Sequence, residues 1–305
     1  MVLTSSEWKD LVQNVVDRDV VPVLGAGACY GIIKLGKDIA ADWLRNGAEY
    51  LGADLALQLP YVAQYHRVKR QDAITIKREF IRDYIKNGSA TVDDTRLLEE
   101  PHGRLASMPF RLIITTNYDD LMTRAFKAVG KKPYTLTCAW NVDDPLEKLA
   151  IIEEQSAIDP SEDEPVIFHL HGHSDDPRSL VLLEEDYELF LTKITPSRDG
   201  EAATETILPH YVQSALANSS LLFVGYSLAD MTFRSVFRGI LNRVNRNNTR
   251  RSVTVQYTNN LPVKQSRYSR EYYDHLGINF VNQPAKEFTK ELLKRYKKAN
   301  GRGKS

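Results

Sequence analysis

The chain has 305 residues, of which 42% are hydrophobic, so it can bury a large core and wholesale disorder is excluded. Its 40 basic and 40 acidic side chains balance, so no overall charge draws it to nucleic acid, although local basic patches remain possible. With only 2 cysteines, neither a disulfide framework nor a four-cysteine zinc site can form. We see no signal peptide and no run of about 20 apolar residues that could span a bilayer. We therefore expect a soluble, cytoplasmic protein that does not contact a membrane.

The chain begins with a helix and a short buried strand. Thr4 and Glu7 fit the Thr-x-x-Glu capping box that opens a helix, which is expected to run to about Asp17. Residues 20–24 are apolar and end at a glycine, which predicts a strand. From residue 37 to about residue 106 the apolar spacing is helical, and this gap is too long for a simple crossover between strands. We therefore predict a helical insertion at residues 37–106.

Beyond this insertion, predicted strands and helices alternate. Strands are expected at residues 111–116, 134–140, 166–170, 180–183, 221–224 and 252–257. Helices are expected at residues 119–129, 185–191, 202–218 and 228–244. The alternation predicts an α/β fold: a Rossmann-like, doubly wound and mostly parallel sheet with the helical insertion after its first strand. The core is expected to comprise residues 1–36 and 107–290, and the basic tail at 291–305 to be disordered.

Four of the predicted strands end in small or polar residues. These strand ends lie at residues 25–27, 115–120, 169–172 and 225–228. In an open parallel sheet the carboxyl ends of the strands border one crevice, where ligands bind. The sequence therefore predicts a single site assembled from four separate segments.

Glycines at the first strand end, Gly25-Ala26-Gly27, would let the backbone approach a pyrophosphate. As a dinucleotide-binding pattern it is incomplete, because Gly31 falls one position late and no acidic residue closes a second strand about 20 residues on. A glycine turn that serves packing alone is the alternative. Residues 31–38 have the spacing of a P-loop, but Asp38 stands where Ser or Thr would bind magnesium, so we reject an ATPase site there.

Polar residues close the second strand end. The amide of Asn117 both donates and accepts hydrogen bonds, which suits a sugar hydroxyl or a positioned water. Asp119 or Asp120 has a simpler alternative role, because either carboxylate can cap the following helix. Asn117 is therefore the more pointed candidate.

Three alternating histidines follow the third strand. His169, His171 and His173 would share one face if the strand continued. Together with Asp175, His171 and His173 nearly fit a binuclear metallohydrolase motif, although the last histidine of that motif is missing. In a second interpretation Gly172 frees His171 to act as a general base. In a third, the histidines are hydrogen-bonded polar residues at the edge of the sheet.

The fourth strand end comes close to the nucleophile elbow of serine hydrolases. Gly225 and Ser227 fit that motif, and Ala229 takes the place of its last glycine. Such a hydrolase also needs a downstream acid and histidine, and only His275 follows. Alternatively, Gly225 and Ser227 contact a phosphate or a ribose.

Taken in order, these four segments resemble the sirtuin-like NAD-binding domain, and most of all its prokaryotic branch that hydrolyses NAD in antiphage defence. The resemblance covers roughly residues 18–36 and 108–260. It implies that Asn117 orients the nicotinamide ribose or the attacking water, that His171 is the catalytic base and that Asp119 assists on the ribose or nicotinamide side. The residues that it implies for binding NAD are Gly25, Ala26, Gly27, Thr116, Gly225 and Ser227.

The resemblance implies an NAD+ glycohydrolase that cleaves the nicotinamide–ribose bond to give ADP-ribose and nicotinamide. NAD is then the substrate, and water is the simplest acceptor. Because the zinc module of protein-deacylating sirtuins needs four cysteines, we expect neither zinc nor another metal. The resemblance also implies a homo-oligomer and a HerA-type ring ATPase as partner, while direct nucleic-acid binding stays open. An unregulated enzyme would deplete host NAD, so we expect the isolated chain to be weakly active or autoinhibited.

Two alternatives of other classes remain. The first is a catalytically silent nucleotide sensor that gates a partner ATPase or nuclease. The second is a different hydrolase: a metal-dependent phosphodiesterase that uses His171, His173 and Asp175, or a serine hydrolase that uses Ser227.

Overall fold

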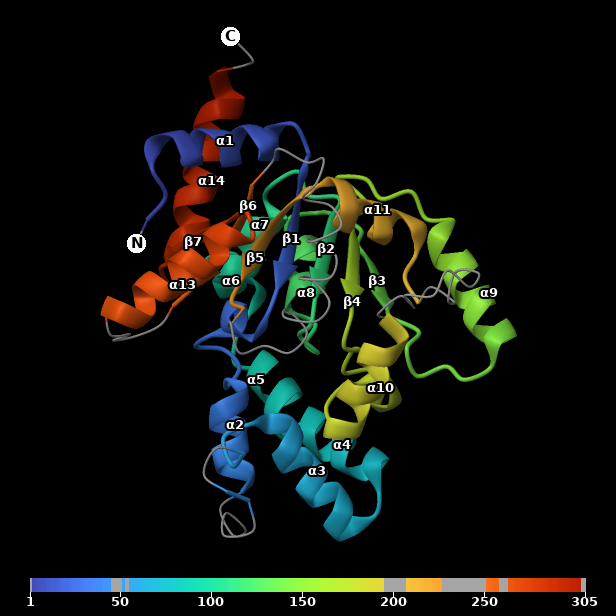
Figure 1. Cartoon of the computed structure of the whole chain (residues 1–305). Helices are drawn as coiled ribbons and strands as arrows, with labels where there is room; N and C mark the ends of the chain where they lie inside the picture. Colours follow the sequence, from blue (N-terminus) through green and yellow to red (C-terminus); the bar gives the residue numbers. More distant parts are fainter. Residues whose placement is uncertain are drawn as a thin grey trace.

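The computed structural model describes residues 2–44, 51–52, 55–194, 207–226, 251–257 and 263–302, and these residues build a central parallel sheet (Figure 1). Its strand order is β3-β4-β2-β1-β5-β6-β7, and all six neighbouring pairs are parallel. The strands are β1 Val20–Leu24, β2 Leu112–Thr115, β3 Tyr134–Thr137, β4 Val166–His169, β5 Ser220–Val224, β6 Ser252–Gln256 and β7 Ile278–Asn282. The predicted Rossmann-like α/β fold is confirmed.

The strand order places a change of direction at the centre of the sheet. From β1 the chain moves to β2 on one side and completes that half with β3 and β4. It then returns to the other side of β1 to form β5, β6 and β7. The strands that face each other across this change are β1 and β5. In open α/β sheets a ligand crevice forms at the carboxyl ends of such a pair.

Helices cover both faces of the sheet, as an all-parallel sheet requires. One apolar cluster joins the sheet to α1 Ser5–Val16, α7 Pro101–Ala106, α8 Leu121–Ala128 and α14 Ala285–Arg302. A second cluster, on the other face, joins it to α10 Glu184–Ile194, α11 His210–Asn218 and α13 Val263–His275. The strands β1, β2, β4, β5 and β6 are buried along their whole length, which explains their continuous apolar runs.

A series of helices separates β1 from β2. It comprises α2 Gly36–Trp43, α3 Leu59–Arg70, α4 Ala73–Phe80, the π-helical turn Ile81–Lys86, α5 Asn87–Ser89, α6 Asp94–Leu97 and α7. Figure 1 shows α2, α3, α4 and α5 beyond the carboxyl ends of the strands. The last helix, α7, packs instead against α8 and α14 of the sheet's own helical layer. The division of the chain into a core and an insertion at residues 37–106 stays a prediction.

Some predicted elements differ from the structure or fall outside it, and one observed strand was not predicted. Residues 180–183 form a buried connection before α10 rather than a strand, because their apolar side chains reflect burial and not strand pairing. The strand β7 was not predicted. The helix predicted at 228–244 lies outside the described residues, as do the first residues of the one predicted at 202–218.

The C-terminal segment is helical where we expected disorder. Residues up to Arg302 continue α14, so the prediction of a disordered tail from residue 291 is wrong for that part. Phe288 and Leu292, one helical turn apart, are buried, and the Phe288 ring stacks on Trp8 of α1 with centroids 5.1 Å apart. The guanidinium of Arg295 also lies over the Trp8 ring, 4.8 Å from its centroid. The basic residues thus occupy the outer face of an amphipathic helix.

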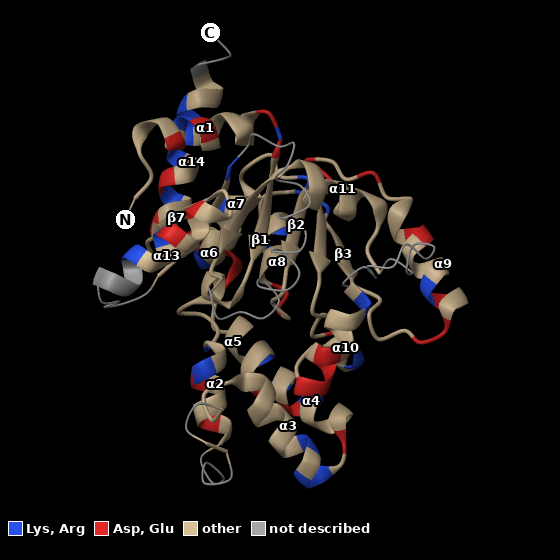
Figure 2. Ribbon diagram, in the orientation of Figure 1, with Lys and Arg blue, Asp and Glu red and all other residues tan. Residues whose placement is uncertain are grey.

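No helix in the described part of the chain combines the length and apolar composition needed to cross a membrane. Lys, Arg, Asp and Glu are interspersed over the helices, and the acidic start of α10 lies near α3 and α4 (Figure 2). There, Arg67 Nε of α3 lies 3.4 Å from Glu185 Oε1.

A buried ion pair connects α4 to α10. Lys77 Nζ lies 2.8 Å from Asp186 Oδ1, and both side chains are almost inaccessible to solvent. Asp186 Oδ2 also accepts hydrogen bonds from the backbone N–H groups of Leu182 and Leu183. The carboxylate therefore holds the connection before α10 as well as the helical segment that carries Lys77.

We expect Lys77→Met to lower the free energy of unfolding by about 3–5 kcal/mol, because it leaves a buried carboxylate without its cation. The exposed pair between Arg267 and Glu271 supplies a control. There, Arg267→Met should cost less than about 1 kcal/mol, because solvent screens exposed charges. Urea denaturation of both variants measures the difference, and equal costs would contradict the importance of the buried pair.

Candidate active site at the carboxyl ends of the strands

Two glycine turns touch where β1 and β5 end. Gly25 N–H donates to Val224 O at 2.9 Å, and Gly27 N–H donates to Gly225 O at 3.0 Å. A Cβ on Gly27 would lie 2.8 Å from Gly225 Cα, and one on Gly225 would lie 2.2 Å from Ala28 N. Gly225 also has a φ of +79°, in the left-handed region that favours glycine. These glycines therefore serve a close backbone contact, the packing role that the sequence left open.

The end of β2 is fastened to this contact. Thr116 N–H donates to Leu24 O at 3.0 Å, and the Thr116 hydroxyl lies 3.0 Å from the hydroxyl of Tyr226, directly after Gly225. The predicted binding residue Thr116 thus bridges the ends of three strands, β1, β2 and β5.

Asn117 lies at the centre of the strand ends and is 8% exposed. Its Nδ2 donates to Gly25 O at 3.1 Å and to Cys29 Sγ at 3.2 Å. Its backbone oxygen lies 2.9 Å from His169 Nδ1 at the end of β4. Asn117 is therefore held by groups that follow β1 and β4, while Oδ1 has no hydrogen-bond partner in the described residues. The structure gathers three of the four predicted segments around this side chain.

Asp119 is buried behind Asn117. Its Oδ1 accepts from the N–H of Leu121, the first residue of α8, at 3.1 Å, although the N-cap position itself is held by Asp120, whose side chain makes no capping hydrogen bond. Its Oδ2 accepts from the Cys29 thiol at 3.2 Å. Burial raises the pKa of Asp119 to about 6, because the charged carboxylate loses its hydration.

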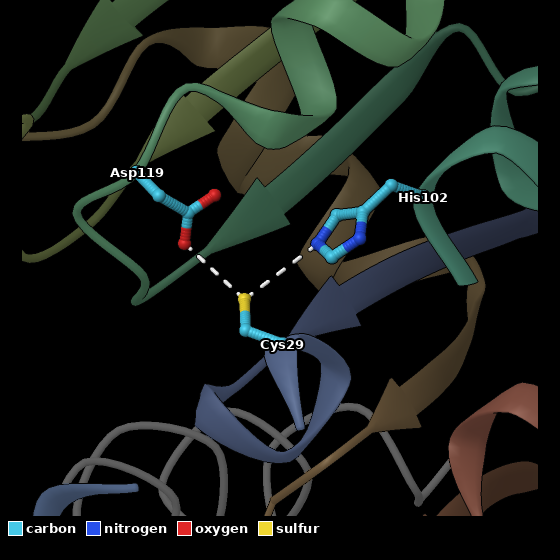
Figure 3. Close-up of side chains that lie close together, drawn as sticks. All are labelled: Cys29, His102 and Asp119. Carbon is cyan, nitrogen blue, oxygen red and sulfur yellow. Dashed lines mark hydrogen bonds between the residues drawn. The ribbon is translucent and has the colours of Figure 1, made fainter. Parts of the chain in front are cut away.

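Cys29 and His102 join Asp119 in a cluster that sequence reasoning missed (Figure 3). Cys29 Sγ lies 3.6 Å from His102 Nε2, and the two residues are 73 positions apart. Cys29 belongs to the 3-10 turn η1 Ala26–Cys29, and His102 to α7. Burial lowers the pKa of His102 to about 4 and raises that of Cys29 well above its usual value. Because the three side chains come from three separate segments, the sequence contains no ligand spacing that would predict this cluster.

His171 is buried against aromatic rings. Its ring centroid lies 5.1 Å from that of Phe190 and 5.3 Å from that of Tyr187, both in α10. Burial lowers the pKa of His171 to about 3, so the imidazole is neutral near pH 7. Gly172 follows with a φ of +89°, and a Cβ there would lie 2.1 Å from Ser179 O. The chain turns away sharply after His171.

This turn removes the condition under which the three histidines would share one face, because the strand does not continue through them. The rings of His169 and His173 meet with centroids 4.7 Å apart, whereas His171 packs on α10. The strand β4 ends at His169, so strand alternation does not continue through His173. The described residues do not gather His171, His173 and Asp175 into a metal-binding group. Ser227, the remaining predicted site residue, lies outside the described residues.

Comparison with known proteins identifies the class. The SIR2-like domain family matches residues 111–281, more than half of the chain. The chain therefore belongs to the SIR2-like family, and the predicted sirtuin-like resemblance is confirmed.

Among its relatives is "NAD(+) hydrolase ThsA" of Bacillus cereus (strain MSX-D12), 25% identical over 227 residues, which cover 73% of this chain and 40% of that protein. A protein of the same name from Enterococcus faecium is 26% identical over 199 residues, or 65% of this chain and 35% of the relative. A third protein of this name, from Cytobacillus dafuensis, is 24% identical over 133 residues, which cover 44% of this chain and 22% of that protein. The matched region thus spans 40% or less of each relative's length.

The contact between the glycine turns predicts that a Gly→Ala substitution destabilises the protein more at Gly225 than at a glycine with free space around it. Gly130 also has a positive φ, of +83°, but a Cβ there meets nothing within 4 Å. Gly130→Ala therefore measures backbone strain alone, on the order of 1 kcal/mol. We expect Gly225→Ala to cost about 1–3 kcal/mol more, because its Cβ forces the turns apart. Urea denaturation tests this, and equal costs at the two positions would show that the turns can separate freely.

The burial of His171 predicts a pH-dependent stability. Its pKa is about 3 in the folded protein and about 6.5 in an unfolded chain. Below about pH 6.5 the unfolded chain therefore binds a proton that the folded protein does not, so stability falls as pH falls toward 3. Relative to the non-titrating variant His171→Gln, we expect the wild type to lose about 2 kcal/mol between about pH 7.5 and about pH 5. Because other groups are common to both proteins, a pH-independent difference in unfolding free energy would contradict this burial.

Proposed function

We propose that this chain is an NAD+ glycohydrolase that releases nicotinamide and ADP-ribose. The observation that carries the proposal is the placement of Asn117, buried and fixed at the meeting point of the strand ends, in a member of the SIR2-like family. Three relatives carry the name NAD(+) hydrolase, which supports the same substrate here.

The chemistry places modest demands on the protein. Cleaving the nicotinamide–ribose bond passes through an oxocarbenium-like state, as glycoside hydrolysis does. Nicotinamide is cationic in NAD and leaves neutral, so it needs no general acid. The site must hold the ribose in a reactive orientation and position a water molecule. We assign the first task to Asn117, whose Oδ1 is directed to no described partner while Nδ2 is fully engaged by Gly25 and Cys29.

We assign the role of proton acceptor to His171. Its imidazole is neutral near pH 7, as a base must be. A pKa of about 3 makes it a weak base in the absence of substrate. The anionic pyrophosphate of NAD would raise that pKa on binding, because a nearby negative charge favours the protonated imidazole. Asp119 would act more indirectly, since its carboxylate is occupied by Cys29 and Leu121.

The glycine turns would border the pyrophosphate. The N–H groups of Gly25 and Gly27 already donate to Val224 at the end of β5 and to Gly225 directly after it, so we assign them a role through their lack of side chains rather than through their amides. Ala26, which lies between them, is exposed, so its side chain does not meet the turn after β5. Thr116, Gly225 and Ser227 complete the proposed binding set.

The proposal includes regulation. From the sirtuin-like resemblance we infer a cytoplasmic antiphage-defence effector that forms a homo-oligomer and works with a HerA-type ring ATPase. The chain alone is then expected to turn over NAD slowly. A silent nucleotide sensor is the competing outcome of the experiment below.

We expect the purified wild type to release nicotinamide from NAD. Chromatography measures this release, in reactions with and without a HerA-type ATPase. Asn117→Ala and His171→Gln should each reduce release by about a hundredfold or more, because they remove positioning and proton acceptance. His210→Ala serves as a control, since His210 is exposed at the start of α11 and should leave release unchanged.

Each variant needs a check that it is folded, by its urea transition, and that it binds NAD, by calorimetry. Release that persists in folded Asn117→Ala would overturn the assigned role of Asn117. Wild type that binds NAD yet releases no nicotinamide under either condition would favour the sensor.

A further inference from the structure

Cys29, His102 and Asp119 bring three metal-binding side chains together in the interior (Figure 3). Cys29 Sγ lies 3.2 Å from Asp119 Oδ2 and 3.6 Å from His102 Nε2, and all three atoms lie within 4.8 Å of one another. On a tetrahedral zinc ion, a sulfur ligand and a nitrogen or oxygen ligand lie about 3.5 Å apart. The cluster therefore needs little movement to close on one ion.

A nucleophilic cysteine does not explain this cluster. In such a site the imidazole takes the thiol proton and a carboxylate orients the imidazole. Here Asp119 contacts the thiol itself, and the buried Nδ1 of His102 has no partner in the described part of the chain.

The surroundings of the cluster favour a cation. The Asp119 carboxylate accepts hydrogen bonds from the Cys29 thiol and the Leu121 N–H, and the acidic Asp120 lies near it. His102 completes the cluster, but burial lowers its pKa to about 4, so its imidazole is neutral near pH 7 and supplies no positive charge. A buried carboxylate without a cation is costly, and a bound divalent ion would supply the missing charge. Asn117 Nδ2 also donates to Cys29 Sγ, and hydrogen bonds of this kind support a metal-bound ligand atom.

We propose that Cys29, His102 and Asp119 bind one divalent metal ion of the zinc class, with a fourth position left for water. A thiolate and an imidazole favour zinc over magnesium or calcium, which prefer oxygen ligands. Binding replaces the thiol proton of Cys29, and any proton on Asp119, with the metal, and these protons pass to solvent. This site is unlike the four-cysteine module of deacylases, because its three ligands are a thiol, an imidazole and a carboxylate.

The ion would join three segments that the sequence keeps apart. Cys29 precedes the helices between β1 and β2, His102 belongs to the last of them, and Asp119 follows β2. A metal here would fasten both ends of this helical segment to the sheet. Because His102 Nδ1 lacks a described partner to orient the ring, we expect weaker binding than at a site with a fixed imidazole. The NAD chemistry proposed above does not require the ion.

Cobalt(II) provides a direct test, because a cysteine thiolate bound to it absorbs in the near ultraviolet. Reduced protein freed of metal by a chelator should develop this absorption at one Co2+ per chain and lose it on addition of Zn2+. Cys29→Ser should abolish the absorption, whereas Cys138→Ser should retain it, since Cys138 is equally buried but outside the cluster. His102→Gln should weaken Co2+ binding about tenfold or more.

Zinc should also raise the thermal midpoint of wild type and of Cys138→Ser but not of Cys29→Ser. The proposal is overturned if folded wild type shows no thiolate–cobalt absorption. It is also overturned if the absorption survives Cys29→Ser, or if His102→Gln binds Co2+ as tightly as wild type does. If Cys29→Ser does not fold, His102→Gln in the otherwise intact chain decides the matter. The measurement involves no NAD, so its failure is distinct from a failure of the proposed activity.

Discussion

The carboxyl edge of the sheet depends on direct backbone contact between two turns, one after β1 and one after β5. Gly27 and Gly225 approach so closely that a side chain on either would overlap the other turn. Since β1 and β5 are neighbours at the change of direction, this contact sets the distance between the two halves of the sheet at the point where ligands bind. Gly25, whose carbonyl holds the Asn117 amide, belongs to the same turn. The placement of the candidate catalytic amide therefore follows from glycine packing.

Buried polar groups around this contact restrict one another. An amide enclosed by protein must find partners, and the Asn117 side-chain amide finds them in the turn after β1. The backbone oxygen of Asn117 lies beside His169 Nδ1 at the end of β4. The buried Nε2 atoms of His169 and His173 have no partner in the described residues, although both rings lie beside each other near Asn117. Leaving buried polar atoms unpaired costs stability, and such costs concentrate at functional sites. The strand ends therefore combine rigid positioning with polar atoms still available to a ligand.

The sequence predicted the sheet well because buried parallel strands have continuous apolar runs, as β1, β2, β4, β5 and β6 do. The same rule failed at residues 180–183, where an apolar run is buried without strand pairing. It also missed β7, in which the polar Asn279 and Asn282 are only partly buried and interrupt the apolar run. Asn117 and His171 could be selected because they follow strands. The contact of Cys29 with His102 could not be predicted, because it depends on where α7 packs after the other described helices between β1 and β2. Likewise, no sequence pattern predicts that the N–H groups of Gly25 and Gly27 already donate to Val224 and Gly225.

The position of His171 depends on elements remote from it in sequence. Its backbone oxygen accepts from Val181 N–H at 2.9 Å, and Val181 O accepts from the Tyr118 hydroxyl at 2.7 Å. The next residues, Leu182 and Leu183, are held by Asp186, which pairs with Lys77 of α4. His171 also packs on Phe190 of the same α10. A displacement of α4 would thus be passed to α10 and to the segment bonded to His171. Because buried ion pairs tolerate little separation, the helices between β1 and β2 help to fix the imidazole even though none of them supplies it.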